Sequence, residues 1–365
     1  MAGLMPERGT VDFSVDEFTG AVGDVAVVLP LVVALAALTE LSLAVMLVWF
    51  GIFQIVFGLY YGLPISVEPM KALAALAIAG ALTAGELALA GIALGVVLIL
   101  IGVPRLLDRV GFLFGDPVVR GVQLAVAFVL LEIAIDLSLD DITLAVIGFA
   151  IAMLVIVIGY HTLSAIAVIA VGGGVALWVA GIPSPELPAM GLAYTSDDLT
   201  VSLAVADATL AQLAMTIGNA ALATSVLLGD LYERDISADR LSTGMGVMNI
   251  VSVPLGALPM CHGSGGVAGK YAFGARTGGS NIYLGIGYLL VAIFAVGLVV
   301  AFPLSMLGVI LVIVSLQLAM VSLKTEQLWL TIGVGVLGVL TNIGLAFLVG
   351  VGIYLIWRWY GATDT

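Results

Sequence analysis

The sequence of 365 residues is too apolar for a soluble protein. Hydrophobic residues make up 62% of it and charged residues only 10%, and the mean hydropathy is +1.26. Soluble domains carry about 25% charged residues, so the composition predicts a polytopic protein with the lipid bilayer as its surroundings. The net charge of −13 comes from single acidic residues scattered through the predicted loops and tails, which is typical of solvated loops.

The composition also argues against several classes of function. Basic and aromatic residues do not alternate in runs, so we expect no nucleic acid partner. Cys261 is the only cysteine, which excludes an intrachain disulfide. The sequence has no phosphate-binding loop of an ATPase and no paired metal-ligand spacing. We therefore expect no cofactor, no bound metal, no catalytic residues and no enzymatic activity.

The chain divides into apolar segments of about the 20 residues that one membrane crossing needs. In the first half these are 21–38, 41–61, 64–82, 86–103, 117–135, 142–158 and 163–180. A polar, proline-rich stretch follows at 181–200, and the second half gives 208–228, 241–255, 262–275, 282–302 and 304–323. The remaining run, 327–359, is too long for one crossing and contains Thr341 and Asn342, so it predicts two short helices.

Proline and glycine interrupt the third segment of each half. Pro64 and Pro69 precede one run of small residues, and Pro259 and a glycine cluster precede the other. Interrupted segments at matching positions in two halves indicate the central site of a transporter. Seven segments per half insert with opposite topology, so we predict an all-α fold of seven plus seven segments in an inverted repeat. The repeats are residues 21–180 and 201–360.

Basic residues lie on one side of this topology. With a cytoplasmic N-terminus, every connecting loop that holds Lys or Arg falls inside, whereas the loops assigned outside hold acidic residues only. This is the positive-inside pattern. We expect a plasma membrane protein with both termini cytoplasmic. Residues 1–20 form a polar tail without the apolar stretch of a signal peptide, residues 181–200 an extracellular linker and residues 361–365 a second tail.

The two interrupted segments form a candidate anion site, because free N–H groups at helix starts attract negative charge. The residues expected to bind the substrate are Ser66, Val67, Glu68, Met70, Lys71, His262, Gly263, Ser264, Gly265, Gly266 and Lys270. Two helix starts offer roughly one positive charge together. A dianion therefore also needs Lys71, Lys270 or a proton that travels with it.

The interrupted segments resemble the signatures of a known family. Residues 64–72 read PISVEPMKA and residues 259–277 read PMCHGSGGVAGKYAFGART. With EFTGAVGD at 17–24 and TIGN at 216–219, they resemble the molybdate transporter family, which is related to the sulfate permease superfamily. The likeness covers nearly the whole chain. It implies the fold of uracil and sulfate permeases, with the substrate between the third and tenth helices.

Glu68 stands where the third-segment motif of this family usually has glutamine, and it has two interpretations. An ionised carboxylate at a helix mouth repels an anion, so Glu68 either binds a proton together with the substrate or pairs with Lys71 three residues on. His262 is either a hydrogen-bond donor that takes part in proton coupling or a cap of the tenth helix.

Other polar and small residues have structural alternatives. Gly265 and Gly269 are also explained by close helix packing, and Ser66 and Ser264 by capping of helix starts. Three further acidic residues lie in or near apolar segments, and each also has a structural interpretation. Asp24 would cap the first helix, Asp207 would cap the eighth, and Glu132 would lie near the outer surface.

These features favour a secondary active transporter that imports a tetrahedral oxyanion, with molybdate first and sulfate second, coupled to protons. The alternatives are a permease for a nucleobase or a carboxylate, and a passive anion channel. A homodimer is common in this fold, and nothing in the sequence specifies its interface.

Overall fold

The computed structural model describes residues 11–113, 115–182, 184–294 and 301–361. The first half contains α1 (Val15–Leu38), α2 (Leu43–Tyr61), β1 (Glu68–Pro69), α3 (Lys71–Ile78), α4 (Ala84–Gly102), α5 (Leu107–Val110), η1 (Gly111–Leu113), α6 (Asp116–Asp140), α7 (Ile142–Val157), η2 (His161–Leu163) and α8 (Ser164–Ala180). The second half contains α9 (Leu203–Met215), η3 (Thr216–Ala223), α10 (Thr224–Tyr232), α11 (Ala238–Ser252), η4 (Val253–Leu255), β2 (Met260–Cys261), α12 (Ser264–Ala272), α13 (Gly279–Phe294), α14 (Leu304–Ser322), α15 (Leu328–Leu340) and α16 (Ile343–Gly361).

The predicted order of helices is confirmed within the described residues. The short helix α5 is extra, and α9, η3 and α10 form one continuous helix in which η3 is a π-helix. The interrupted segments are the third of each half, α3 and α12, and each is only a half-helix. Among the described residues, seven helices are long and apolar enough to cross a membrane. The run from Gln327 splits into α15 and α16, as expected.

Some helix boundaries differ from those expected. α1 begins at Val15, six residues before the predicted segment, because Ser14 accepts a hydrogen bond from the Glu17 N–H and acidic residues suit the first turn of a helix. The eighth segment is also longer, from Leu203 to Tyr232. α13 is described from Gly279 to Phe294, and residues 295–300 of its predicted segment lie outside the described part.

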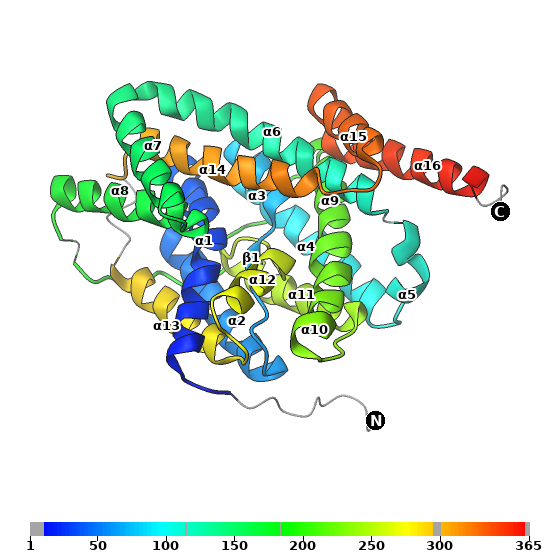
Figure 1. The fold of residues 1–365 in the computed structure, drawn as a ribbon, viewed down its shortest axis with the longest axis horizontal. Coiled ribbons are helices and arrows are strands. Elements are labelled where there is room, and N and C mark those ends of the chain that lie inside the picture. Colours follow the sequence, from blue (N-terminus) through cyan, green and yellow to red (C-terminus); the bar gives the residue numbers. More distant parts are fainter. Residues whose placement is uncertain (1–10, 114, 183, 295–300, 362–365) are drawn as a thin grey trace.

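The helices form two groups (Figure 1). α1 to α4 contact α9 to α13, and α6 to α8 contact α14 to α16. In Figure 1, α6 and α14 run side by side along one edge of the molecule, whereas β1 and α12 lie near its centre. α3 and η3 of the first group both touch α6 of the second. The interrupted segments therefore belong to the first group and lie close to the boundary with the second.

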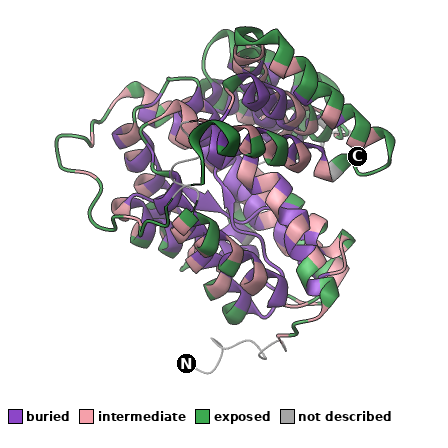
Figure 2. Cartoon of the chain, turned by 90° about the vertical axis from the view of Figure 1, so that its left-hand side faces the viewer, coloured by how far each residue is buried: buried purple, intermediate pink, exposed green. Residues whose placement is uncertain are grey.

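The two interrupted segments meet through a short antiparallel strand pair. Glu68 is opposite Cys261 and Pro69 is opposite Met260, and all four residues are buried. The Asn249 side chain accepts a hydrogen bond from the Met260 N–H at 2.8 Å and donates one to the Met260 oxygen at 2.7 Å. Both buried backbone groups of Met260 therefore have hydrogen-bond partners. Figure 2 shows this centre as buried and the outer helices as the more exposed part.

Candidate functional site

The side chain of Glu68 lies on the start of the opposite half-helix. Its Oε1 accepts a hydrogen bond from the Gly266 N–H of α12 at 2.8 Å, and its Oε2 pairs with the Lys71 ammonium of α3. Glu68 is fully buried, whereas the Lys71 side chain is 13% exposed. The ion pair named as one alternative for Glu68 is therefore present. The chain's own carboxylate occupies the position in which the first amides of α12 attract an anion.

Two glycines of α12 make this approach possible. A Cβ atom on Gly263 would overlap the Glu68 carboxyl group, and one on Gly266 would overlap Ser66, Asp24 and Glu68. Close approach to these polar groups thus explains both glycines. Gly269 fits the packing alternative, since its Cβ would lie 3.5 Å from the Gly23 oxygen of α1.

A second buried ion pair lies behind the first. The Lys270 ammonium is 3.0 Å from Asp24 Oδ2, and both side chains are completely buried. Lys270 also donates to Gln54 Oε1 at 3.1 Å and to Asn281 Oδ1 at 2.7 Å. Ser66 donates to Asp24 Oδ1 at 2.6 Å. The positive charge of Lys270 is therefore balanced inside the protein, and Lys270 positions α12 against α1, α2 and α13.

The structure corrects three capping interpretations. Asp24 does not cap the first helix, because α1 begins nine residues earlier and carries Asp24 in its interior. Ser66 caps no helix, since the N-cap of α3 is Met70 and the Ser66 hydroxyl donates to Asp24. Ser264 caps none either: the N-cap of α12 is Gly263.

His262 lies between the strand pair and two aromatic rings. Its Nδ1 is 3.0 Å from the Ser66 oxygen, and the rings of Phe57 and Tyr61 meet it edge-on at 4.8 and 6.0 Å between centroids. His262 is fully buried, and within the described part of the chain its Nε2 has no hydrogen-bond partner. It does not cap α12, because Gly263 holds that position.

The start of α3 is closed by a neutral side chain. Gln212 Oε1 accepts hydrogen bonds from the N–H groups of Ala72 at 2.9 Å and Leu73 at 3.4 Å. Its Nε2 donates to the Thr216 hydroxyl at 2.9 Å. The side chain of Glu68 thus occupies the start of α12, and that of Gln212 occupies the start of α3. These are the two helix starts that the sequence suggested for an anion.

The accessible side of the site is formed by Ser264, Gly265 and Asn219. The Ser264 hydroxyl donates to Asn219 Oδ1 at 2.5 Å, and Gly265 is exposed with no atom within 4 Å of an added Cβ. Asn219 comes from η3, and π-helical turns occur frequently at functional sites. Its neighbour Gly218 packs against Val119 of α6, which puts this side at the boundary between the two helix groups.

The remaining predicted residues contribute backbone groups. The Val67 oxygen accepts a hydrogen bond from Gln54 at 3.2 Å, and the Met70 N–H donates to the Pro259 oxygen at 2.9 Å. Met70 is fully buried. Among the described residues, no group of three His, Cys, Asp or Glu side chains is placed to hold a metal ion.

Two acidic residues singled out in the sequence lie away from this site. Asp207 Oδ1 accepts a hydrogen bond from the Gly344 N–H at 2.5 Å, so it stabilises the start of α16 and does not cap α9, whose N-cap is Ser202. Glu132 is exposed on α6. Sequence reasoning missed Gln54, Gln212 and Asn281. Their only signal was an amide side chain in an apolar helix.

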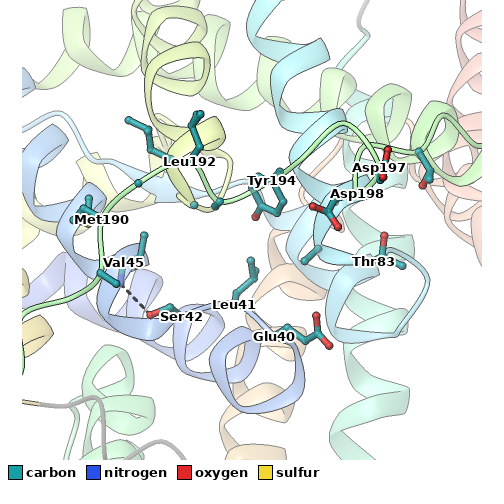
Figure 3. A pocket seen from close by; sticks show the side chains of 18 residues that line it. Glu40, Leu41, Ser42, Val45, Thr83, Met190, Leu192, Tyr194, Asp197 and Asp198 are labelled. Atoms are coloured by element: carbon teal, nitrogen blue, oxygen red, sulfur yellow. Dashed lines mark hydrogen bonds between the residues drawn. The ribbon is translucent and has the colours of Figure 1, made fainter.

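A cavity of about 720 Å³ lies between residues 189–200 of the linker and the starts of α2 and α4. In Figure 3 the linker with Met190, Leu192 and Tyr194 passes over Ser42 and Val45 of α2. Hydrogen bonds from Thr195 lower the pKa of Asp198, and burial raises the pKa of Tyr194 to about 12. No residue of the central site lines this cavity.

Comparisons with known proteins give the same family that the interrupted segments suggested. A sequence profile described as "Molybdate transporter of MFS superfamily" matches residues 16–130 and 204–318, one stretch in each half. "Molybdate transporter 2" of Arabidopsis thaliana is 30% identical and its match covers 84% of this chain and 78% of its own length. "Molybdate transporter 1" of Chlamydomonas reinhardtii is 26% identical, with 95% of this chain and 92% of its own length covered.

Solved structures share the fold at low sequence identity. The transmembrane domain of the cyanobacterium bicarbonate transporter BicA matches with a TM-score of 0.69 at 17% identity, over 94% of this chain and all of that one. The murine anion transporter Slc26a9 in its inward-facing state matches with a TM-score of 0.70 at 13% identity, over 98% of this chain and 71% of that one. The chain thus has the inverted-repeat fold of these transporters.

Proposed function

The chain belongs to the molybdate transporter family, and from this premise we propose that it is a secondary active transporter for a tetrahedral oxyanion. Molybdate is the first candidate, because it is the substrate named for the related plant and algal proteins. Sulfate is the second, since it has the same charge and tetrahedral shape. The anion binds between the starts of α3 and α12 and crosses together with a proton.

The observation that carries this proposal is the position of the Glu68 carboxylate. Its two oxygens take a backbone N–H from Gly266 and the ammonium of Lys71, which are the donors that an oxyanion needs. Ser264 and Gly265 lie on the accessible side, in the first turn of α12, where backbone N–H groups offer further donors. An oxyanion that enters from this side meets an occupied set of donors, so Glu68 has to leave before the anion binds.

A proton provides the means for this exchange. Protonated Glu68 no longer pairs with Lys71 and competes less well for the Gly266 N–H, because both interactions favour the charged form. When Glu68 is protonated, the charge of the site changes less on binding of the anion. A dianion that replaces one carboxylate charge adds a single negative charge to the site, whereas a dianion beside an ionised Glu68 adds two. A buried site disfavours the larger charge strongly.

The buried pair of Asp24 and Lys270 has a supporting role in this mechanism. It adds no net charge, and it ties α1 and α2 to α12 directly behind the Glu68 carboxylate. His262 binds the Ser66 oxygen through Nδ1 and keeps Nε2 unpaired. It is the second candidate for the proton, since this unpaired nitrogen is the atom at which a neutral imidazole accepts one.

We further propose that the protein lies in the plasma membrane with both termini in the cytoplasm. The one-sided distribution of Lys and Arg in the loops supports this orientation. It places the ends of α2 and α4 at the cytoplasmic face and the starts of these helices at the outer face. A homodimer agrees with the fold, and the transport mechanism does not depend on it.

The test is uptake of labelled molybdate by proteoliposomes with and without an inward proton gradient. We expect the gradient to drive accumulation above the external concentration, which a passive channel cannot do. Excess sulfate measures the preference between the two oxyanions. Glu68→Gln removes the titratable group and is expected to make uptake insensitive to the gradient. Glu132→Gln is the matched control, because Glu132 is an exposed glutamate of α6.

One result would contradict the role of Glu68 as proton carrier, and another would contradict the choice of an oxyanion as substrate. If Glu68→Gln kept the full dependence on the proton gradient, Glu68 would not carry the proton. If wild-type protein accumulated neither molybdate nor sulfate under any gradient, a nucleobase or carboxylate permease would become the better interpretation.

A further inference from the structure

A second cavity of about 820 Å³ lies apart from the linker, and Phe57 and Tyr61 in its wall separate it from His262 of the transport site. It is lined by the last turns of α2, the end of α4 and the first three turns of α11. α2 ends at Tyr61 on the side of the molecule where α1 begins, because consecutive helices α1 and α2 run in opposite directions. The cavity thus opens where three membrane helices reach the edge of the apolar layer, on the face proposed as cytoplasmic.

Arg240 is the unusual residue of this cavity. Its guanidinium lies over the rings of Tyr60 and Tyr61, with 5.0 and 5.6 Å between Cζ and the ring centroids. Its Nη2 is buried and has no hydrogen-bond partner among the residues that the structure describes. An unsatisfied buried donor destabilises a folded protein, and more strongly when it is charged. Such a group requires an explanation, and a ligand that accepts the hydrogen bond supplies one.

The other charged groups around the cavity leave room for an anion. Asp239 is buried, and its Oδ1 accepts the Leu107 N–H at 2.9 Å, so one of its oxygens is engaged at the start of α5. Asp235 is exposed at the rim, where solvent screens its charge. Arg105 is exposed at the same rim and adds a positive charge there.

Apolar side chains form the remaining wall, and several are open to the outside. Val56, Tyr60, Val103 and Val247 line the cavity and are 44%, 45%, 64% and 48% exposed. On a membrane helix such side chains face lipid. Leu59 and Val251 extend this exposed surface along α2 and α11. The cavity therefore combines a positively charged group, Arg240, with an apolar surface that suits a hydrocarbon chain.

We propose that this cavity binds one anionic phospholipid. Its phosphate accepts the free N–H of Arg240, and its acyl chains lie along Val56 and Val247. Arginine at the boundary of a bilayer is a frequent partner of lipid headgroups, and a soluble anion would gain nothing from the apolar wall. The lipid bridges α2 and α11, the helices that lead into the two paired strands. Occupancy therefore stabilises the arrangement that holds the transport site.

The experiment measures thermal unfolding of the purified protein in micelles with added phosphatidylglycerol, phosphatidylcholine or glycerol phosphate. We expect phosphatidylglycerol to raise the unfolding temperature by several degrees more than phosphatidylcholine does, and glycerol phosphate to raise it little. Arg240→Gln is expected to abolish the difference between the two lipids, and Arg240→Lys to keep part of it. Arg120→Gln is the matched control, because Arg120 pairs with Asp116 away from the cavity.

The unfolding temperature of Arg240→Gln in phosphatidylcholine shows whether the variant folds. If it does not fold, Val103→Trp, which fills the cavity at an exposed position, serves in its place and is expected to reduce the lipid effect as well. Equal stabilisation by both lipids, or an undiminished preference in folded Arg240→Gln, would overturn the proposal. Full stabilisation by glycerol phosphate alone would replace the lipid with a soluble phosphate compound.

Discussion

The starts of α3 and α12 follow the two paired strands, yet their backbone N–H groups have partners of different kinds. At α3, Ala72 and Leu73 donate to the amide oxygen of Gln212. At α12, Gly266 donates to the carboxylate of Glu68, which belongs to the other repeat. An amide has no proton to gain or lose at ordinary pH, whereas a carboxylate does. The α12 start is therefore the one whose occupancy can respond to protons.

The two starts also differ in their surroundings. Behind α12 lie the buried charges of Asp24 and Lys270, and beside it lies open space at Gly265. The start of α3 has neutral neighbours from α9 in addition to its own Lys71. An inverted repeat can therefore use one half-helix as the variable binding element and the other as a fixed support.

The largest effect is expected from Asp24→Asn, which leaves the Lys270 ammonium buried without its carboxylate. Breaking a buried pair from one side costs about 3–5 kcal/mol. We expect a loss of that size in the free energy of unfolding, measured by denaturant titration in detergent. The double variant Asp24→Asn with Lys270→Met removes both charges and should recover much of the loss. A single variant as stable as wild type would show that the pair does not hold α12.

Gly266→Ala tests the close approach of Glu68 to α12. The added methyl group overlaps Ser66, Asp24 and Glu68, and overpacking of this kind costs about 1–3 kcal/mol. We expect molybdate uptake to fall at least tenfold, since the Glu68 contact and the substrate position both require this N–H. Gly173→Ala in α8 is the control, because its methyl group meets open space away from the site. Equal uptake by the two variants would contradict this assignment of Gly266.

Gln212→Leu tests the role of the uncharged side chain that binds the first N–H groups of α3. It removes the acceptor of two buried N–H groups, which costs about 1–3 kcal/mol. Since Gln212 carries no titratable proton, we expect lower stability and an unchanged dependence of uptake on the proton gradient. Thermal unfolding and proteoliposome uptake measure the two effects. A lost gradient dependence in this variant would mean that the two helix starts act alike.

Much of the fold could be predicted from local features of the sequence. Pro64, Pro69 and Pro259 mark both interrupted segments, and Thr341 with Asn342 marks the division between α15 and α16. These signals are informative because proline interrupts a helix. Polar residues are unfavourable in the centre of a membrane helix. The early start of α1 was missed, since its cap, Ser14, precedes an acidic turn that resembles a solvated tail.

The candidate site could be predicted only in part. Glu68, Lys71 and the glycines of α12 stood out because charges and glycine clusters are rare in apolar segments. Gln54, Gln212 and Asn281 did not stand out, since the hydrogen bonds of Gln212 to Ala72, Gln54 to Lys270 and Asn281 to Ile65 join residues that are 140 to 216 positions apart. The capping roles assigned to Asp24 and Asp207 failed for the same reason, because their carboxylates bind groups of other helices, Gln54 of α2 and Lys270 of α12 for Asp24 and Gly344 of α16 for Asp207.

The central claim is that the Glu68 carboxylate and the transported oxyanion exclude one another at the start of α12. Equilibrium binding of molybdate to the purified protein at two pH values one unit apart, with sulfate as competitor, tests it most directly. If a proton must displace the carboxylate, binding tightens by up to about tenfold at the lower pH in wild type. In Glu68→Gln it should be tight at both values. Wild-type binding that is equally strong at both pH values, or abolished by Glu68→Gln, would contradict the claim.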